Sequence, residues 1–134
     1  RCCRQLLEQG AFVTTNVMFG GPGETEATVQ QGIANLLSLK PAYSVIFAGI
    51  RLFHGAPLIE TARQQGKIPA DWNGIGALYY FAPGIAPERL HEMLQKGFQN
   101  SRYCIYPPAS RNHDIQMIHK FGFMKLRNLR LGKK

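Results

Sequence analysis

The stretch that decides the fold is Val17-Met18-Phe19-Gly20-Gly21-Pro22-Gly23-Glu24-Thr25. It ends the segment AFVTTNVMF, residues 11–19, whose β-branched and aromatic residues predict a buried strand. The four residues GGPG then interrupt the strand, and Thr25 is a suitable N-cap for a helix that begins at about Glu26. The stretch therefore predicts a strand that ends in a glycine-rich turn and leads directly into a helix.

The sequence on either side extends this pattern to helix, strand, helix, strand. Residues 1–9 predict the end of a helix, and Gly10 stands where a helix-terminating glycine is expected. The helix from Glu26 has an apolar face at Val29, Ile33, Leu36 and Leu37, and Pro41 closes it. The run Tyr43–Leu52 is almost continuously apolar, as in a parallel strand covered on both faces. This order predicts a parallel α/β unit, and two strands alone are too few for a stable sheet. We expect the sheet to continue outside this sequence or in another chain.

The second half of the chain predicts further helices. A short helix has Pro57 at its first position, residues 67–86 read as a loop, and Pro87 opens a helix with Leu90, Met93, Leu94 and Phe98 inward. A last helix is predicted from about Asn112. We therefore divide the chain into residues 1–66, an α/β part, and residues 67–134, a mainly α-helical extension with a basic tail.

Charge is concentrated at the C-terminal end. The whole chain carries +8, and residues 101–134 hold eight basic residues against one acid, Asp114, which leaves +7 there. Such a segment binds nucleic acid or anionic lipid, or it is a solvated end. No apolar run approaches the ~20 residues of a transmembrane helix. The three cysteines, Cys2, Cys3 and Cys104, form no CxxC pair and no disulfide framework, which favours a reducing cytoplasm.

The glycine-rich turn is the best candidate for a binding site. Glycines let the main chain turn sharply and let a ligand approach it closely, and free N–H groups at a helix start attract anions. Glu24 could accept a hydrogen bond, hold an ammonium group or stabilise the helix start. The turn is neither a Walker A loop nor a GxGxxG loop, so a βα turn without a ligand stays open as the alternative.

Several segments resemble the radical S-adenosylmethionine enzymes. The segment FGGPGETEATV, residues 19–29, resembles the GxPGET segment that closes the fifth barrel strand in that family. The segment GIRLFHGAPL, residues 49–58, resembles the end of the sixth strand, although His54 and Ala56 stand where Pro and Thr are usual. ARQQGKI, residues 62–68, resembles the helix-to-glycine segment that follows. ALYYFAP, residues 77–83, resembles members that carry a cobalamin-binding domain.

The resemblance covers about residues 1–108 and implies a fold and an activity. The fold would be the C-terminal βαβ portion of a parallel, partial TIM-type (βα)6 barrel, followed by the helical extension. The parent enzyme would use a [4Fe–4S] cluster to cleave S-adenosylmethionine reductively, and the 5′-deoxyadenosyl radical would serve hydrogen abstraction or methyl transfer on a small-molecule or lipid-type substrate. Cobalamin is a candidate further cofactor. The cluster motif CxxxCxxC is absent from this sequence, so we expect an inactive fragment that the rest of the barrel completes.

The resemblance also implies which residues hold the cofactor. Val17 to Gly20 would border the adenosyl group, while no catalytic residue and no metal ligand is assigned within this chain. Arg51 is a charge in an apolar strand, so we expect it to face the barrel mouth and pair with Glu24 or with a carboxylate of the ligand. The predicted cofactor-binding residues are Asn16, Gly20, Gly21, Gly23, Glu24 and Arg51.

Two alternatives from other classes stay open. One is a small basic module that binds nucleic acid through residues 101–134. The other is a structural α/β fragment that assembles with another subunit, because an unpaired parallel edge favours association.

Overall fold

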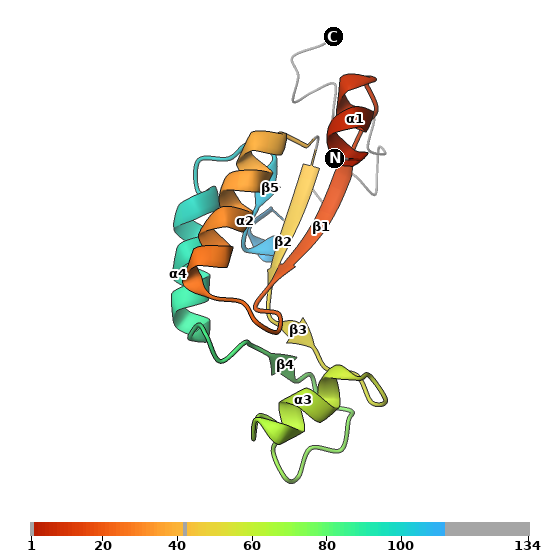
Figure 1. The fold of residues 1–134 in the computed structure, drawn as a ribbon, viewed down its shortest axis with the longest axis vertical. Helices are drawn as coiled ribbons and strands as arrows, with labels where there is room; N and C mark the ends of the chain where they lie inside the picture. Colours follow the sequence, from red (N-terminus) through yellow and green to blue (C-terminus); the bar gives the residue numbers. More distant parts are fainter. Residues whose placement is uncertain (1, 42, 112–134) are drawn as a thin grey trace.

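The computed structural model describes residues 2–41 and 43–111 of the chain. Within them the order of elements is α1 (Cys2–Glu8), β1 (Thr14–Phe19), α2 (Glu26–Leu39), β2 (Tyr43–Ala48), β3 (Ile50–Arg51), α3 (Leu58–Gln64), β4 (Tyr79–Tyr80), α4 (Pro87–Phe98), β5 (Cys104–Ile105) and the 3-10 helix η1 (Pro108–Arg111). Figure 1 shows β1, β2 and β5 beside α2 and α4, with α3, β3 and β4 at one end.

A parallel sheet forms the centre of the described residues. Its order is β1-β2-β5, and both strand pairs are parallel. The register runs from Thr14 opposite Tyr43 to Phe19 opposite Ala48, so β1 and β2 end at the same edge. The predicted parallel α/β unit is confirmed, because the βαβ crossover through α2 joins two neighbouring parallel strands.

Helix α2 begins where the sequence predicts. The Thr25 side chain accepts a hydrogen bond from the Thr28 N–H, and the Thr28 hydroxyl accepts one from the Thr25 N–H over 2.9 Å. This reciprocal capping box satisfies N–H groups that a helix start leaves free. Val29, Ile33 and Leu36 are buried, which confirms the predicted apolar face.

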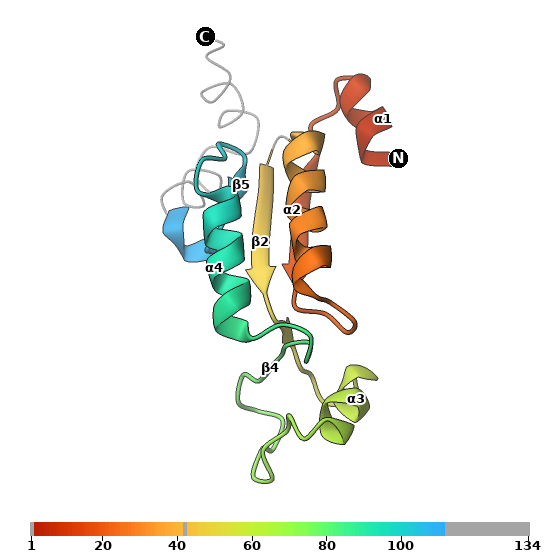
Figure 2. The same ribbon diagram turned by 60° about the vertical axis from the view of Figure 1, so that its left-hand side comes forward.

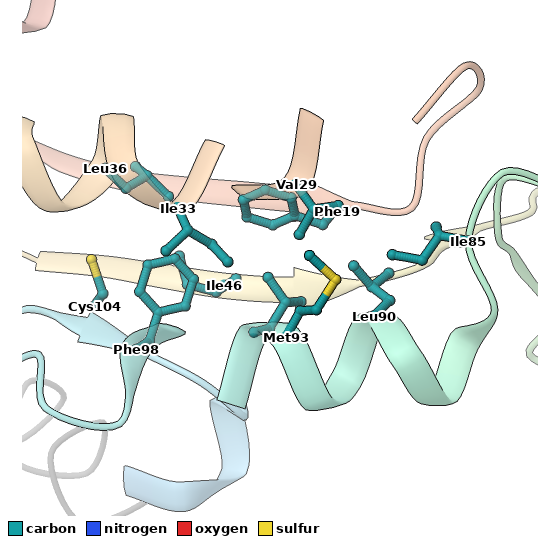
Figure 3. Packing of buried hydrophobic residues seen from close by; sticks show 11 residues of the cluster. Phe19, Val29, Ile33, Leu36, Ile46, Ile85, Leu90, Met93, Phe98 and Cys104 are labelled. Atoms are coloured by element: carbon teal, nitrogen blue, oxygen red, sulfur yellow. The ribbon is translucent and has the colours of Figure 1, made fainter. Parts of the chain in front are cut away.

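Helices α2 and α4 lie side by side on one face of the sheet (Figure 2). The main hydrophobic core fills the space between them (Figure 3), and it contains Phe19, Val29, Ile33, Leu36, Ile46, Ile85, Leu90, Met93, Leu94, Phe98 and Cys104. All four inward positions predicted for α4 are buried. The core draws on both predicted segments of the chain, since α4 and β5 lie beyond residue 66.

The predicted strand Tyr43–Leu52 is interrupted, which corrects the sequence analysis. Gly49 has φ 81°, and β3 leaves the parallel sheet to pair antiparallel with β4. A Cβ at Gly49 would lie 2.7 Å from the Phe81 ring, so this ring packs directly on the main chain where it bends. A left-handed bend is favourable for glycine alone among residues, and it redirects the chain out of the sheet.

Two strands lie where the sequence predicts loop and helix. Strand β4 falls in the predicted loop 67–86, and β5 falls in the predicted helical extension. With β3 and α3, β4 forms a small unit with its own core of Leu52, Ile59, Ala62, Tyr80 and Ala82. The predicted helix from Asn112 and most of the basic tail lie outside the described residues.

The other face of the sheet is bare where β1 and β2 end, although Tyr43 and Ile105 on the same face are buried. Met18 on β1 is 61% exposed, and its register partner Phe47 on β2 is 39% exposed. Helix α1 buries none of its residues and leaves Leu6 exposed. Parallel sheets are normally covered on both faces, so the part of this face at Met18 and Phe47 lacks its usual cover among the described residues. No described helix has the length and apolarity to cross a membrane.

Candidate functional site

The glycine-rich turn follows β1 at the carboxyl edge of the sheet, and Glu24 organises it. The Glu24 carboxylate accepts hydrogen bonds from the N–H groups of Gly20 and of Gly21, the latter over 3.2 Å. The Glu24 N–H in turn donates to the Gly21 carbonyl over 3.1 Å. Glu24 therefore holds the turn closed from within by accepting hydrogen bonds, the first of the three roles that the sequence left open.

Gly20 and Gly23 are needed in the turn for different reasons, whereas Gly21 has no positive φ and leaves room for a side chain. Gly20 has φ 99°, and a Cβ there would lie 3.2 Å from both the Gly49 nitrogen and Leu90 Cδ2. Gly23 has φ 79°, but a Cβ there would meet no atom within 4 Å. A Cβ at Gly21 would reach Ile50 Cδ1 at 3.4 Å. The absence of a side chain at Gly20 thus lets Gly49 and Leu90 pack closely against the turn. At Gly23, glycine is needed only because φ is positive.

Three segments of the chain meet at this edge. The Gly49 N–H donates to the Phe19 carbonyl over 2.8 Å, and the Ala82 N–H donates to the Gly20 carbonyl over 2.9 Å. The turn after β1, the bend after β2 and the segment after β4 are therefore joined by main-chain hydrogen bonds. In parallel α/β folds the carboxyl ends of the strands are where ligands bind. The predicted residues Gly20, Gly21 and Glu24 lie together here.

Arg51 lies elsewhere and does not pair with Glu24, one of the two partners expected for it. It is exposed on β3, opposite Tyr79 of β4, and its guanidinium carbon lies 5.1 Å from the centre of the Phe53 ring. None of the ion pairs among described residues includes Arg51. The reason is the bend at Gly49, which puts Arg51 on an exposed two-stranded ribbon where a charge needs no buried partner.

Asn16 lies on the bare face of the sheet. It is exposed, stands opposite Val45, and shares its side of β1 with Met18. The structure thus divides the predicted residues between three places. The turn holds the glycines and Glu24, the sheet face holds Asn16, and the β3–β4 ribbon holds Arg51.

The sequence analysis missed one group of side chains near this edge. His91 Nδ1 is hydrogen-bonded to the Tyr106 hydroxyl, and the two rings stack with centroids 6.0 Å apart. Phe81, which covers Gly49, lies 6.3 Å from the His91 ring. Burial raises the pKa of Tyr106 above its ordinary value of 10.0. No local pattern could reveal this group, because its members come from three separate segments.

The described residues offer no ligand set for an iron–sulfur cluster. Among residues 2–41 and 43–111 no group of three or more His, Cys, Asp or Glu side chains could hold a metal ion. The cysteines are free thiols, with Cys2 exposed, Cys3 half-buried and Cys104 buried. Burial raises the pKa of Cys104, although hydrogen bonds with Ser101 and Ser44 oppose the shift. A thiol of this kind is a poor metal ligand, because the thiolate is the ligating form.

The described fold is a parallel α/β arrangement that also occurs in a radical S-adenosylmethionine enzyme. One similar solved structure is the radical S-adenosylmethionine methyltransferase TsrM from Kitasatospora setae, with cobalamin and a [4Fe-4S] cluster bound. The TM-score is 0.67 at 19% identity, and the match covers 100% of this chain and 34% of that chain. This likeness shows the fold alone. No protein-family model matches the sequence, and no curated protein does either.

Proposed function

We propose that this chain forms the last part of a radical S-adenosylmethionine barrel, with β1 and β2 as its final two barrel strands. The observation that carries the proposal is the fold match, which extends over the whole chain at a TM-score of 0.67. The two segments that resemble the family's fifth-strand and sixth-strand endings support it. They follow adjacent parallel strands, β1 and β2, and meet at one edge of the sheet.

In this proposal the chain positions the cofactor. The backbone from Val17 to Gly20 borders the adenosyl group, and the Glu24 carboxylate fixes the turn so that its main chain keeps one conformation. Asn16, on the bare sheet face, points toward the inside of the barrel. Arg51 is exposed beyond the carboxyl end of β2, with its charge available to a ligand carboxylate. Gly23 leaves open space above the turn, which a ligand could occupy.

S-Adenosylmethionine supplies a 5′-deoxyadenosyl radical when it is cleaved reductively, and such a radical serves hydrogen abstraction or methyl transfer. The cluster that would deliver the electron does not fit the described residues of this chain. We therefore assign cluster binding to protein outside this chain and expect the chain alone to be inactive. Cobalamin, which the structure of TsrM contains, is a candidate second cofactor of the parent.

The exposed part of the second sheet face supports a barrel in preference to an open sheet. Met18 and Phe47 are neighbours in register and both are exposed, so the sheet presents an apolar strip on the side away from α2 and α4. In a (βα)n barrel the helices cover the outer face, and the inner face is filled by side chains from the other strands. The rest of such a barrel is the partner that this face fits.

The test uses the full-length protein of which this chain would be a part, purified without oxygen. Given reductant and S-adenosylmethionine, it should form 5′-deoxyadenosine, measured by mass. Glu24→Ala removes the carboxylate oxygen that accepts hydrogen bonds from the Gly20 and Gly21 N–H groups. It should lower product formation about tenfold, since ~1.4 kcal/mol corresponds to that factor. Glu88→Ala, at an exposed position on α4, is the matched control and should change nothing. Equal rates in both variants would contradict the role of Glu24. The absence of product from a cluster-loaded enzyme supplied with its substrate would contradict the proposal itself.

A further inference from the structure

The unit formed by β3, α3 and β4 contains a cavity of about 380 Å³. No residue of the glycine-rich turn lines it. One wall is α3 with the residue before it, where Pro57, Glu60 and Arg63 are three positions apart and so share one helix face. The opposite wall is the loop before β4, which contributes Ile68 and Trp72. A volume of this size lies within the range of ~300–1,000 Å³ that ligand sites occupy.

The Trp72 indole is held in one orientation. Its Nε1–H donates to the Gly76 carbonyl over 2.9 Å, so the polar edge of the ring is satisfied inside the loop. The half-buried ring packs against the core of this unit, and it also lines the cavity. A ring already fixed by its own loop can stack on a ligand at a low entropic cost.

His54 contributes to the same cavity from the loop before α3. A Cβ at Gly74, which has φ 85°, would lie 3.4 Å from His54 Cδ2, so the loop before α3 and the loop after it touch here. His54 lines the cavity and is exposed. No hydrogen bond to its ring nitrogens is formed by the rest of the described chain. An imidazole has one donor and one acceptor when neutral, and both can serve a ligand.

The charges at the cavity cancel. Glu60 and Arg63 form an ion pair with each other across one turn of α3, and both side chains are largely exposed. With one acid and one base at the rim, the cavity attracts neither anions nor cations strongly. The lining also includes the apolar residues Ile59, Ile68 and Trp72. This combination favours an uncharged ligand, because an ion would have to give up its hydration without a compensating charge.

We propose that this cavity binds an uncharged, flat heteroaromatic ring, which stacks on Trp72 and hydrogen-bonds to His54. Aromatic stacking on a fixed indole provides the contact area, and the imidazole selects rings with donors and acceptors on their edge. The site is separate from the turn at Gly20 and does not depend on the function proposed for that turn.

The whole chain provides a direct readout, because Trp72 is the one tryptophan in the sequence. Hypoxanthine is a suitable probe, since it is flat, uncharged at neutral pH and has donors and acceptors on its edge. Its addition should quench tryptophan fluorescence along a saturable curve. Cyclohexanol, an uncharged ring that is saturated and not flat, should produce no saturable change. A linear response to hypoxanthine would overturn the proposal, and so would equal binding of cyclohexanol.

Variants at position 54 locate the site. His54→Ala should weaken hypoxanthine binding about fivefold, the value expected for one lost hydrogen bond. His54→Gln keeps a donor and an acceptor and should retain most of the affinity. His91→Ala, a substitution of another exposed histidine that lies on α4, is the control and should bind like the unaltered chain. Circular dichroism of each variant checks that the fold is retained. Equal affinities for His54→Ala and His91→Ala would show that the ring binds elsewhere.

Discussion

Replacing Gly20 by alanine should cost much more stability than replacing Gly23, although both glycines have positive φ. A left-handed conformation costs a non-glycine residue ~1–2 kcal/mol, partly offset by ~0.4–1 kcal/mol from the stiffer unfolded chain. Gly23→Ala, whose methyl group enters open space, should therefore lose about 1 kcal/mol or less. At Gly20 the methyl group would press on the Gly49 nitrogen and Leu90 Cδ2, each at 3.2 Å. Overpacking adds ~1–3 kcal/mol, which brings the expected loss to about 2–4 kcal/mol.

The neighbours of Gly20 have little room to yield. Gly49 donates its N–H to the Phe19 carbonyl and is covered on its other side by Phe81. Urea unfolding of both variants, with the same m value, measures the difference. Gly10→Ala, at φ 77° and also in open space, is a second control and should resemble Gly23→Ala. If Gly20→Ala proves no more costly than Gly23→Ala, the close approach to Gly49 does not limit the fold, and this explanation of Gly20 is refuted.

Three further predictions concern the thiol, the cluster and the tail. Burial raises the pKa of Cys104 above its ordinary 9.0, so its contribution to stability is complete below pH 9.0 and is lost as the pH rises through the folded-state value. The free energy of unfolding of Cys104→Ala, measured with urea, should fall less steeply with rising pH than that of the unaltered chain. The raised pKa values of Tyr103 and Tyr106 account for the part of the slope that remains. A slope equal to that of the unaltered chain would exclude the thiol as a cause. Reconstitution of this chain with iron and sulfide should yield no stoichiometric [4Fe–4S] spectrum, and a full cluster would contradict our assignment of the ligands. If the basic segment binds nucleic acid, affinity for duplex DNA should fall steeply with rising salt concentration and be lost on deletion of residues 120–134. An affinity that does not depend on salt concentration would contradict nucleic-acid binding by this segment.

The elements that the sequence predicts well have their causes in local sequence. Helix α2 combines a capping threonine at Thr25 with three apolar residues at helical spacing, and α4 combines Pro87 with four. Strand β1 is a β-branched run ended by glycine. Each signal lies within about fifteen residues, and each acts on the segment that contains it. The role of Glu24 as a brace within the turn was one of three local options, and the hydrogen bonds to Gly20 and Gly21 select it.

The elements that the sequence does not predict depend on contacts between residues that are far apart in the chain. The run Tyr43–Leu52 looks continuous, and the bend becomes necessary only because Phe81, more than thirty residues later, packs on Gly49. Strand β5 has two residues, too few for any periodicity, and it forms because Cys104 pairs with Ser44 of β2. The exposure of Arg51 follows from the same bend. The expected pairing of Arg51 with Glu24 assumed that the strand continues straight, and the bend rules out that one partner.

Three exposed features have a common explanation in the proposed barrel. Helix α1 buries no residue, β1 has a strand on one side only within the described chain, and Met18 projects from a face that α2 and α4 do not cover. A helix that leads into a parallel strand normally follows an earlier strand, and right-handed crossovers place that helix on the same face as the next one. An earlier strand beside β1 would therefore fill its free edge and give α1 a surface to pack on. It would leave the face of Met18 and Asn16 uncovered, and that face would need side chains from across a closed barrel. An open sheet with one more strand accounts for the first two features, whereas closure accounts for all three.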